Sequence, residues 1–357
     1  MRPFQYSEEH VIELVDRMVR RTFEVDYPWD WPAGVAFYGV GLAYGATKKE
    51  EYLELLKNWV DEYIEYGLPP MSVNVASMGH TLLTLYLETE EEKYLELVRK
   101  KADYLVHEAP KFAEGVLEHT VGGASIFHEQ AWVDTLFMAG YFLVRMGKAL
   151  NEPTYMAEGL NQFRGHEKYL QDPVTNLYYH GWDHLNKNHM SGVFWARGNA
   201  WAAYTLASVL RLVDVKEPAF MGIFGSLRDQ LSALIRLQSP NGLWHTVLTD
   251  PTTYEETSGS AGIAAAIALN GRTPKSYQAV QKAITALMAK VDERGTVLDV
   301  STGTAVMNTV QGYHETSKKR IEGWGQGLAL TFFSHVLIRN KLDAQIELAG
   351  KSWIKED

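Results

Sequence analysis

The sequence of 357 residues contains no cysteine. This excludes disulfide bonds, thiolate metal sites and a cysteine nucleophile, and it fits a reducing compartment. Basic residues are also in deficit, because 34 Lys and Arg stand against 44 Asp and Glu and give a formal net charge of −10. Nucleic acids and anionic membranes select a basic face, so neither is expected as a partner. An anionic small substrate needs only a local basic patch and stays compatible with this balance.

Long apolar runs are absent as well, and no segment reaches the length that spans a membrane. The N-terminus MRPFQYSEEHVIELVDRMVRR begins an amphipathic helix pattern, without the basic start and apolar core of a signal peptide. We therefore expect a cytoplasmic protein. There is also no G-x-S-x-G motif and no Gly-rich loop between a strand and a helix, which argues against a serine hydrolase and a nucleotide-binding protein.

Helical periodicity, in contrast, recurs along nearly the whole chain. Helices are expected to begin near residues 8, 34, 49, 76, 91, 130, 152, 197, 218, 258, 275 and 323. Segments such as 49–66 and 91–107 carry one charged face, whereas GVAFYGVGLAYGA and NAWAAYTLASVL are apolar almost all round, which is typical of buried helices. Ser7 and Thr47 each precede acidic residues and are expected to start helices.

These alternating segments predict helical hairpins arranged in layers. Six such hairpins would close into an (α/α)6 barrel, and a linear α-solenoid is the competing architecture. No proline-rich or low-complexity linker divides the chain, so residues 1–357 are expected to form a single all-α domain.

Aromatic and hydrogen-bonding residues gather in the expected loops, which is typical of a carbohydrate site because sugar faces stack on rings while hydroxyls need polar partners. The tryptophans concerned are Trp29, Trp31, Trp182, Trp195, Trp201 and Trp244. Any one of them taken alone is more often a core residue, and it is the set of six near polar loops that favours a ligand site. The histidines lack the helical spacing with a carboxylate that a zinc site has, so no metal ion is expected.

Two charged residues stand in apolar surroundings. Arg197 opens an expected buried helix and needs an anion, either an internal carboxylate or one on the substrate. Asp134 lies within QAWVDTLFMAG, residues 130–140. It could be a helix cap or a structural hydrogen-bonding group, or a carboxyl whose pKa is raised by desolvation so that it delivers a proton near neutral pH.

Ordinary glycosidases need a second carboxyl facing the first. Asp30, Asp183 and Glu256 are the candidates, and their spacing does not choose among them.

Six ordered blocks carry a family resemblance: WDWPAGVAFYG, QAWVDTLFMAGYF, YYHGWD, FWARGNAWA, YEETSGSAG and GWGQG. From about residue 8 to residue 340, the chain resembles the unsaturated rhamnogalacturonyl hydrolases of glycoside hydrolase family 105 and, more distantly, the unsaturated glucuronyl hydrolases of family 88. The resemblance implies an (α/α)6 barrel without metal or cofactor. Its substrates would be oligosaccharides left by polysaccharide lyases, whose terminal uronate carries a C4–C5 double bond.

The resemblance also assigns roles to single residues. An Asp matching Asp134 protonates C4 and then accepts a proton from the water that adds at C5. Trp195, Arg197 and Trp201 match the FWARxxxW pattern of the uronate pocket, and His180 matches its HxWD block.

At three further positions of the implied pocket, the match between this sequence and the family pattern is less regular. Trp31 stands where some members have Tyr, and His119 takes the place of the histidine before the catalytic helix, with His128 as a competitor. Asn74 falls where many members carry a second Asp. An Asn binds sugar hydroxyls but cannot act as a base or raise the pKa of a neighbour by repulsion.

Several functions stay open on the sequence. The favoured one is removal of an unsaturated uronate from rhamnogalacturonan-type fragments, with oligosaccharide and water as the only partners. Alternatives are an unsaturated β-glucuronyl hydrolase, a saturated exo-glucuronidase or a sugar epimerase on the same fold. A non-catalytic carbohydrate-binding protein is a further alternative, although it would have no use for costly charges at Asp134 and Arg197.

Overall fold

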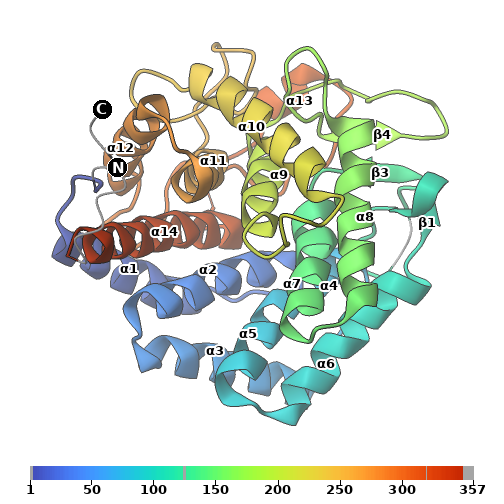
Figure 1. Cartoon of the computed structure of the whole chain (residues 1–357), viewed down its shortest axis with the longest axis horizontal. Helices are drawn as coiled ribbons and strands as arrows, with labels where there is room; N and C mark the ends of the chain where they lie inside the picture. The colour runs from blue at the N-terminus through green and yellow to red at the C-terminus, as the bar shows by residue number, and fades with distance from the viewer. Residues whose placement is uncertain (1–2, 124–125, 319, 349–357) are drawn as a thin grey trace.

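The computed structural model describes residues 3–123, 126–318 and 320–348, and most of them lie in helices (Figure 1). The α-helices are α1 (Glu8–Phe23), α2 (Trp31–Thr47), α3 (Glu50–Tyr66), α4 (Val73–Ala76), α5 (Gly79–Thr89), α6 (Glu92–Asp103), α7 (Phe142–Ala149), α8 (Pro153–Leu170), α9 (Ala196–Val209), α10 (Phe220–Arg236), α11 (Thr257–Asn270), α12 (Pro274–Met288), α13 (Val310–His314) and α14 (Gly323–Leu348). Shorter elements are the π-helical turns η1 (Tyr104–Glu108) and η3 (Leu136–Tyr141), the 3-10 turn η2 (Ala113–Gly115), and the strands β1 (Lys111–Phe112), β2 (Val116–Leu117), β3 (Gln130–Trp132) and β4 (Gly181–Asp183).

The longer helices alternate between an inner and an outer layer. The inner helices are α2, α5, α7, α9, α11 and α14, and each is followed or preceded by an outer partner from α1, α3, α6, α8, α10 and α12. Helix α9 is buried along its whole length, whereas α3 buries only one face. Gly and Ala let the inner helices approach closely: a Cβ on Gly327 of α14 would collide with the backbone of α2 at Val35.

Contacts between the first and last inner helices decide between barrel and solenoid. Helix α14 packs against α2 and against α11, and α11 in turn packs against α9. Helix α9 contacts η3, and α5 contacts both α2 and α7. The inner layer therefore closes on itself as a ring, whereas a linear solenoid would leave its first and last helices apart.

The starts of most helices lie within a few residues of the expected positions. Ser7 caps α1, because its hydroxyl accepts a hydrogen bond from the backbone N–H of His10. The expectation for Thr47 was wrong: Thr47 ends α2, its hydroxyl donating to the carbonyl of Ala43, and α3 begins at Glu50 without a side-chain cap.

The prediction of a helix that begins near residue 130 was also wrong. Residues 130–132 form strand β3, which pairs antiparallel with β4. Regular α-helix is reached only at Phe142, after the π-helical turn η3. The long-range pairing of β3 with β4 overrides the local apolar pattern, which short windows cannot distinguish from a helix.

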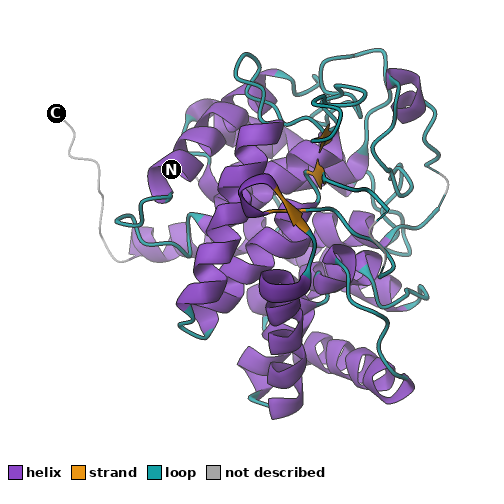
Figure 2. Ribbon diagram, turned by 90° about the vertical axis from the view of Figure 1, so that its right-hand side faces the viewer, coloured by secondary structure: helices purple, strands orange, loops and turns teal. Residues whose placement is uncertain are grey.

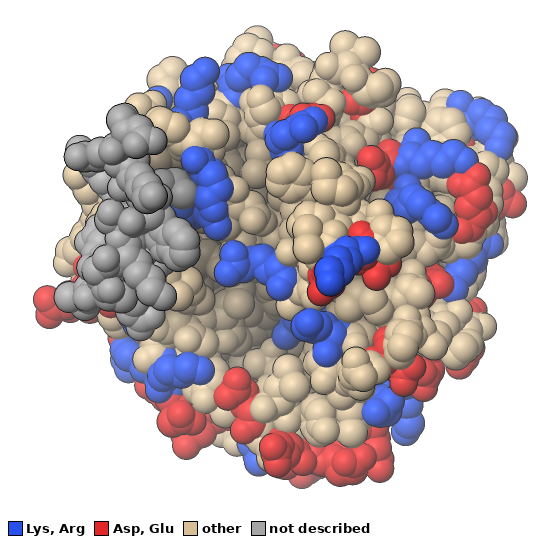
Figure 3. Space-filling view, in the orientation of Figure 1, with Lys and Arg blue, Asp and Glu red and all other residues tan. Residues whose placement is uncertain are grey.

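The main hydrophobic core reaches from Phe4 to Leu337, and two smaller clusters lie around Trp195 and around Phe112. The long loops lie on one side of the molecule (Figure 2). On the face seen in Figure 3, acidic side chains line the lower edge, over α3 and α6, while Lys and Arg lie around a hollow near the centre. In the described part of the chain, no helix combines the length and the apolar character needed to cross a membrane.

Candidate active site

Asp134 lies at the junction between strand β3 and the η3 turn. Its backbone carbonyl accepts hydrogen bonds from the N–H groups of Phe137 and Met138, which places it at the start of the helical segment. The pairing of β3 with β4 continues through Val133, whose N–H donates to the carbonyl of His180. The pairing of β3 with β4 therefore brings a carboxylate and a histidine together from positions 46 residues apart.

A cavity of about 300 Å³ opens in front of Asp134. Six residues predicted for the site line it: Trp31, Asn74, His119, Asp134, Trp195 and Arg197. Sequence reasoning missed the other lining residues, which are Val121, Phe127, Trp132, Met138, Gly303, Thr304 and Ala305. Asp134 is the only carboxylate among these described lining residues.

His180 and Trp201 lie behind the cavity wall. The Nε2 atom of His180 is 3.3 Å from Oδ2 of Asp134, and its Nδ1 is 2.7 Å from the hydroxyl of Tyr313. Both atoms are buried, so this close polar contact is shielded from water. Trp201 is fully buried, with its ring centroid 5.1 Å from that of Phe137. Neither residue lines the cavity, so a substrate-binding role for them stays a prediction.

His119 is the histidine placed in the cavity, rather than His128. The ring of His119 stacks on Trp132 with centroids 4.5 Å apart, and its Nδ1 lies 3.0 Å from the hydroxyl of Thr135. The side chain of His128 is 72% exposed and lies 3.8 Å from Glu118. Burial lowers the pKa of His119 to about 4, so its imidazole is neutral near pH 7.

The pKa of Asp134 departs from the expectation. Burial raises the pKa of this carboxyl, but His180, His119 and the positive charge of Arg197 lower it by more. The net pKa lies below the usual value for Asp, and the prediction of a pKa raised by desolvation was wrong for the ligand-free protein. Burial also lowers the pKa of His180, which leaves an ionised carboxylate beside neutral imidazoles.

The anion for Arg197 is internal. One terminal nitrogen of its guanidinium is 3.6 Å from Oε1 of Glu256, and both side chains are buried. The guanidinium also donates to Ser258 and Thr304 and lies over the ring of Trp195, 4.3 Å from its centroid. The buried guanidinium of Arg197 thus lies in the cavity wall, and its charge is partly balanced by Glu256, which does not line the cavity.

The candidates for a second catalytic carboxyl do not reach the cavity. Asp30 caps α2 by accepting from the N–H of Trp31 at 2.7 Å. Asp183 accepts from the backbone and side chain of Asn186, and Glu256 is committed to Arg197. The described residues therefore hold one carboxylate in the cavity, which does not match the paired arrangement of ordinary glycosidases.

Asn74 and Trp31 form another part of the wall. Asn74 lies in the short helix α4, with its N–H bonded to the carbonyl of Thr120. Trp31 stacks on Trp324 at the start of α14, with ring centroids 4.2 Å apart. The GWGQG motif thus supports the site through packing rather than by holding a phosphate.

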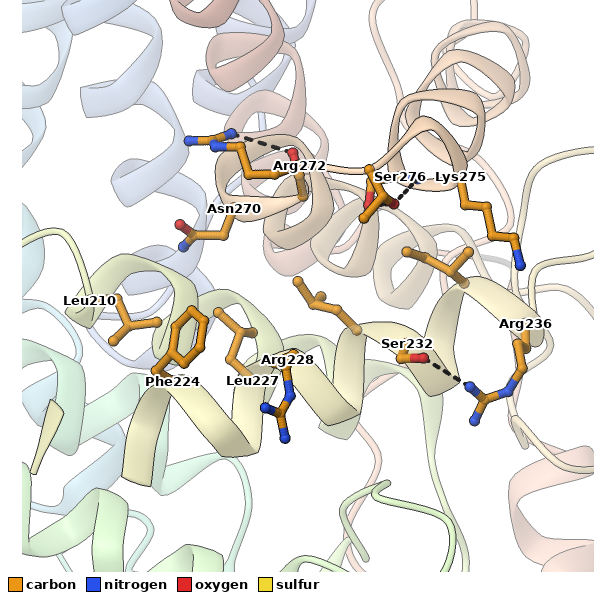
Figure 4. A pocket seen from close by; sticks show the side chains of 14 residues that line it. Leu210, Phe224, Leu227, Arg228, Ser232, Arg236, Asn270, Arg272, Lys275 and Ser276 are labelled. Atoms are coloured by element: carbon orange, nitrogen blue, oxygen red, sulfur yellow. Dashed lines mark hydrogen bonds between the residues drawn. The ribbon is translucent and has the colours of Figure 1, made fainter. Parts of the chain in front are cut away.

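A larger cavity of about 530 Å³ lies elsewhere, between α10 and the start of α12 (Figure 4). Its floor includes Leu210, Phe224 and Leu227, and its rim carries Arg236 and Lys275. It contains no carboxylate among its lining residues and adjoins the C-terminal ends of α9 and α11, whereas Arg197 marks the opposite end of α9. Its chemistry offers no proton donor for glycoside cleavage, so size does not identify the active site here.

No group of three His, Asp or Glu side chains is arranged to hold a metal ion within residues 3–123, 126–318 and 320–348. The lining residues offer instead an acid or base, a cation, amide and hydroxyl groups, and aromatic faces. This combination suits a sugar ring that carries a carboxylate.

The chain is similar to known proteins in both sequence and fold. The family model described as Glycosyl Hydrolase Family 88 matches residues 6–340. The unsaturated rhamnogalacturonyl hydrolase YesR of Bacillus subtilis is 55% identical over 337 residues, which cover 94% of this chain and 97% of YesR. The unsaturated 3S-rhamnoglycuronyl hydrolase of Formosa agariphila is 28% identical over 291 residues, or 76% of each chain.

Among solved structures, a possible member of family 105 from Salmonella enterica superposes with a TM-score of 0.90. It is 25% identical, and the match covers 95% of this chain and 96% of the other. This likeness confirms the (α/α)6 barrel expected from the sequence.

Proposed function

From the premise that this chain belongs to Glycosyl Hydrolase Family 88, we propose that it removes a 4,5-unsaturated uronyl residue from the non-reducing end of lyase-generated oligosaccharides. Rhamnogalacturonan-type fragments are the favoured substrates, because YesR, the relative at 55% identity, is an unsaturated rhamnogalacturonyl hydrolase. The observation that carries the proposal is that Asp134 is the single carboxylate among the described residues of a cavity that also presents a cation and aromatic faces.

In the proposed reaction Asp134 acts first as an acid and then as a base. Its proton passes to C4 of the vinyl ether, and the positive charge that develops at C5 is shared with the ring oxygen. Water adds at C5 and returns a proton to Asp134. The resulting hemiketal opens by breaking the bond from C5 to the ring oxygen, and the hemiacetal left at C1 then releases the leaving sugar with its hydroxyl. One water molecule is consumed, and one carboxyl is enough because C1 is never attacked.

The low pKa of Asp134 in the free protein fits this scheme only if the substrate raises it. An anionic uronate in the same cavity places a second negative charge near Asp134, which disfavours its ionised form. The substrate also displaces water, which strengthens that repulsion. We therefore assign the proton of Asp134 to the complex rather than to the free enzyme.

The ultraviolet absorbance of the conjugated double bond tests the proposal directly, because hydration destroys it. The protein is mixed with unsaturated disaccharides made by pectin, ulvan and glycosaminoglycan lyases. Absorbance should fall with the rhamnogalacturonan product, and Asp134→Asn should slow the fall by at least about a hundredfold. Asp183→Asn, outside the cavity, is the matched control and should keep its rate. A flat trace with every product would refute the proposal.

A further inference from the structure

The hydroxyl of Tyr313 links two parts of the cavity wall from behind. Tyr313 is fully buried in the short helix α13. Its hydroxyl lies 2.7 Å from Nδ1 of His180 and accepts a hydrogen bond from the N–H of Met307 at 3.2 Å. Met307 directly follows the chain segment 303–305 that lines the cavity, with one residue between them. One phenol therefore contacts both the wall-forming segment and the histidine behind Asp134.

The bond from Met307 limits what the phenol can do with His180. A phenol carries one proton and two lone pairs, and the N–H of Met307 occupies one lone pair. Burial raises the pKa of Tyr313 to about 12, so the phenolic proton is present near pH 7. Ser191 also acts on the phenol, but its hydroxyl makes no hydrogen bond in the described part of the chain. Because a buried proton without an acceptor costs free energy, donation to Nδ1 of His180 is favoured.

The other nitrogen of the imidazole leads to the same conclusion. Nε2 of His180 is 3.3 Å from Oδ2 of Asp134, and neither atom has a hydrogen-bond partner among the other described residues. Burial and the charge of Arg197 lower the pKa of His180, so its ring carries a single proton. Asp134 is ionised in the ligand-free protein, because its pKa lies below the usual value. Its negative charge repels a lone pair on Nε2 and attracts an N–H, which places the proton of the ring on Nε2.

Aromatic packing holds the plane of this imidazole. The ring centroid of His180 lies 4.2 Å from that of Trp195 and 5.7 Å from that of Trp132. Tyr313 belongs with Trp195 to one small hydrophobic cluster. A flip of the ring would take both nitrogens away from their neighbours. The groups that select the protonated nitrogen are therefore the hydroxyl of Tyr313 and the carboxyl of Asp134.

The protonated nitrogen decides which oxygen of Asp134 can carry the catalytic proton. Oδ2 is buried against Nε2 of His180, although the side chain of Asp134 as a whole keeps 15% exposure. A bare Nε2 would accept a proton from Oδ2 and hold it away from the substrate. An N–H on Nε2 excludes this arrangement, so the proton of the neutral carboxyl is placed on Oδ1.

We propose that Tyr313 is a positioning residue, whose hydroxyl holds His180 in the tautomer protonated on Nε2 and thereby keeps the exchangeable proton of Asp134 on Oδ1. The tautomer does not depend on the reaction. Its catalytic consequence rests on the proposed function and deepens it, because Asp134 then donates to C4 from Oδ1 and takes the proton of water back at the same atom. Tyr313 acts through His180, since it does not line the cavity.

Nitrogen NMR of the protein with isotope-labelled histidine distinguishes the two tautomers, because a protonated and a bare ring nitrogen resonate far apart. The variant His180→Gln identifies the signals of His180. In the parent protein Nδ1 should be bare and Nε2 protonated. A proton on Nδ1 instead would overturn the inference, and this measurement needs no variant of Tyr313.

Tyr313→Phe removes the hydroxyl and keeps the ring. It is added to Asp134→Asn, a background in which the carboxylate charge no longer acts on His180. A second set of signals, with the proton on Nδ1, should appear only when Tyr313→Phe is present. Tyr94→Phe is the matched control, because Tyr94 is fully buried and its hydroxyl donates to Asp61 at 2.7 Å, outside the cavity. If Tyr313→Phe leaves the signals unchanged, Tyr313 does not select the tautomer.

Kinetics connects the tautomer to catalysis. Tyr313→Phe should lower the maximum of kcat about tenfold and leave KM unchanged, because proton transfer alone is affected. Part of the donation to the ionised form of Asp134 is lost, so the pKa of Asp134 should rise and the basic limb of the pH profile of kcat should shift to higher pH. His119 and Arg197, which also lower this pKa, are unchanged in the variant. Tyr94→Phe should show neither effect.

The outcomes separate this inference from the proposed function. An unchanged kcat together with an unmoved basic limb would overturn the positioning role of Tyr313. If the expected tautomer is found and is lost in Tyr313→Phe, while the parent protein hydrolyses no lyase product, the tautomer is supported and the proposed reaction alone is refuted.

Discussion

Replacing Glu256 by Gln is expected to lower the melting temperature by about 4–7 °C. Glu256 is fully buried and carries the counter-charge of Arg197. Its Oε1 accepts from the N–H of Ser301 at 2.9 Å, and its Oε2 accepts from the N–H of Gly259 at 2.6 Å. Because both oxygens face backbone donors, the amide nitrogen of Gln meets an N–H in either orientation.

The magnitude follows from these contacts. Removing one partner of a buried ion pair costs about 3–5 kcal/mol, because the other charge is left uncompensated. Unfolding of 357 residues carries an entropy of about 0.75 kcal/mol per degree, so that loss corresponds to about 4–7 °C. Arg197 keeps its bonds to Ser258 and Thr304, which argues for the lower part of the range.

Differential scanning calorimetry measures this shift. Glu255→Gln is the matched control: it is the neighbouring residue, half-buried, and accepts from the side chain of Asn241. It should melt within about 1 °C of the parent protein. If Glu256→Gln also melts within about 1 °C, Arg197 does not depend on Glu256 for its counter-charge, and the assignment of its internal anion fails.

Three further changes test other parts of the structure. Gly327→Ala should lower the free energy of unfolding by about 1–3 kcal/mol, because its Cβ would collide with the backbone of α2. Gly45→Ala, in the same layer, has open space around its Cβ and should raise the free energy of unfolding by about 0.5–1 kcal/mol. Equal denaturation midpoints for the two variants would contradict the close packing. Asn74→Asp adds a carboxylate to the wall of the cavity, and its negative charge should raise the pKa of Asp134. The basic limb of the pH profile of kcat should therefore shift to higher pH. A basic limb at the same pH as in the parent protein would contradict the proximity of residues 74 and 134. Burial depresses the folded-state pKa of His119 to about 4, so its contribution to stability, about 3 kcal/mol, is full above pH 6.5 and is lost as the pH falls toward 4. The melting temperature of His119→Gln should therefore fall less between pH 6.5 and pH 4 than that of the parent protein. An equal fall in both proteins would refute the depressed pKa of His119.

The helices and their layering were predictable because their signals are local. Ser7 caps α1 as its sequence context indicates, and the apolar character of α9 around its whole circumference matches its burial. The sequence also pointed to six of the thirteen residues that line the cavity, among them Asp134 and Arg197, which stand out as charges in apolar segments.

Other features depend on contacts that no local pattern carries. Glu256 looked like a candidate acid, but the fold sets it against Arg197, 59 positions away. Segment 303–305 reaches the cavity only because the ring of inner helices closes. The apolar pattern of residues 130–132 is compatible with the start of a helix, and only the pairing with β4 makes them a strand.

The pKa of Asp134 illustrates how the sequence argument and the structure diverge. From the sequence, only burial could be weighed, and burial alone raises the pKa of a carboxyl. The fold adds the charge of Arg197 and the contact with His180, and these lower the pKa by more than burial raises it. We infer that a neutral glycoside would leave Asp134 ionised and inert, while a uronate brings the negative charge that favours its protonation. The preference for an anionic substrate would then lie in the proton transfer itself as well as in binding.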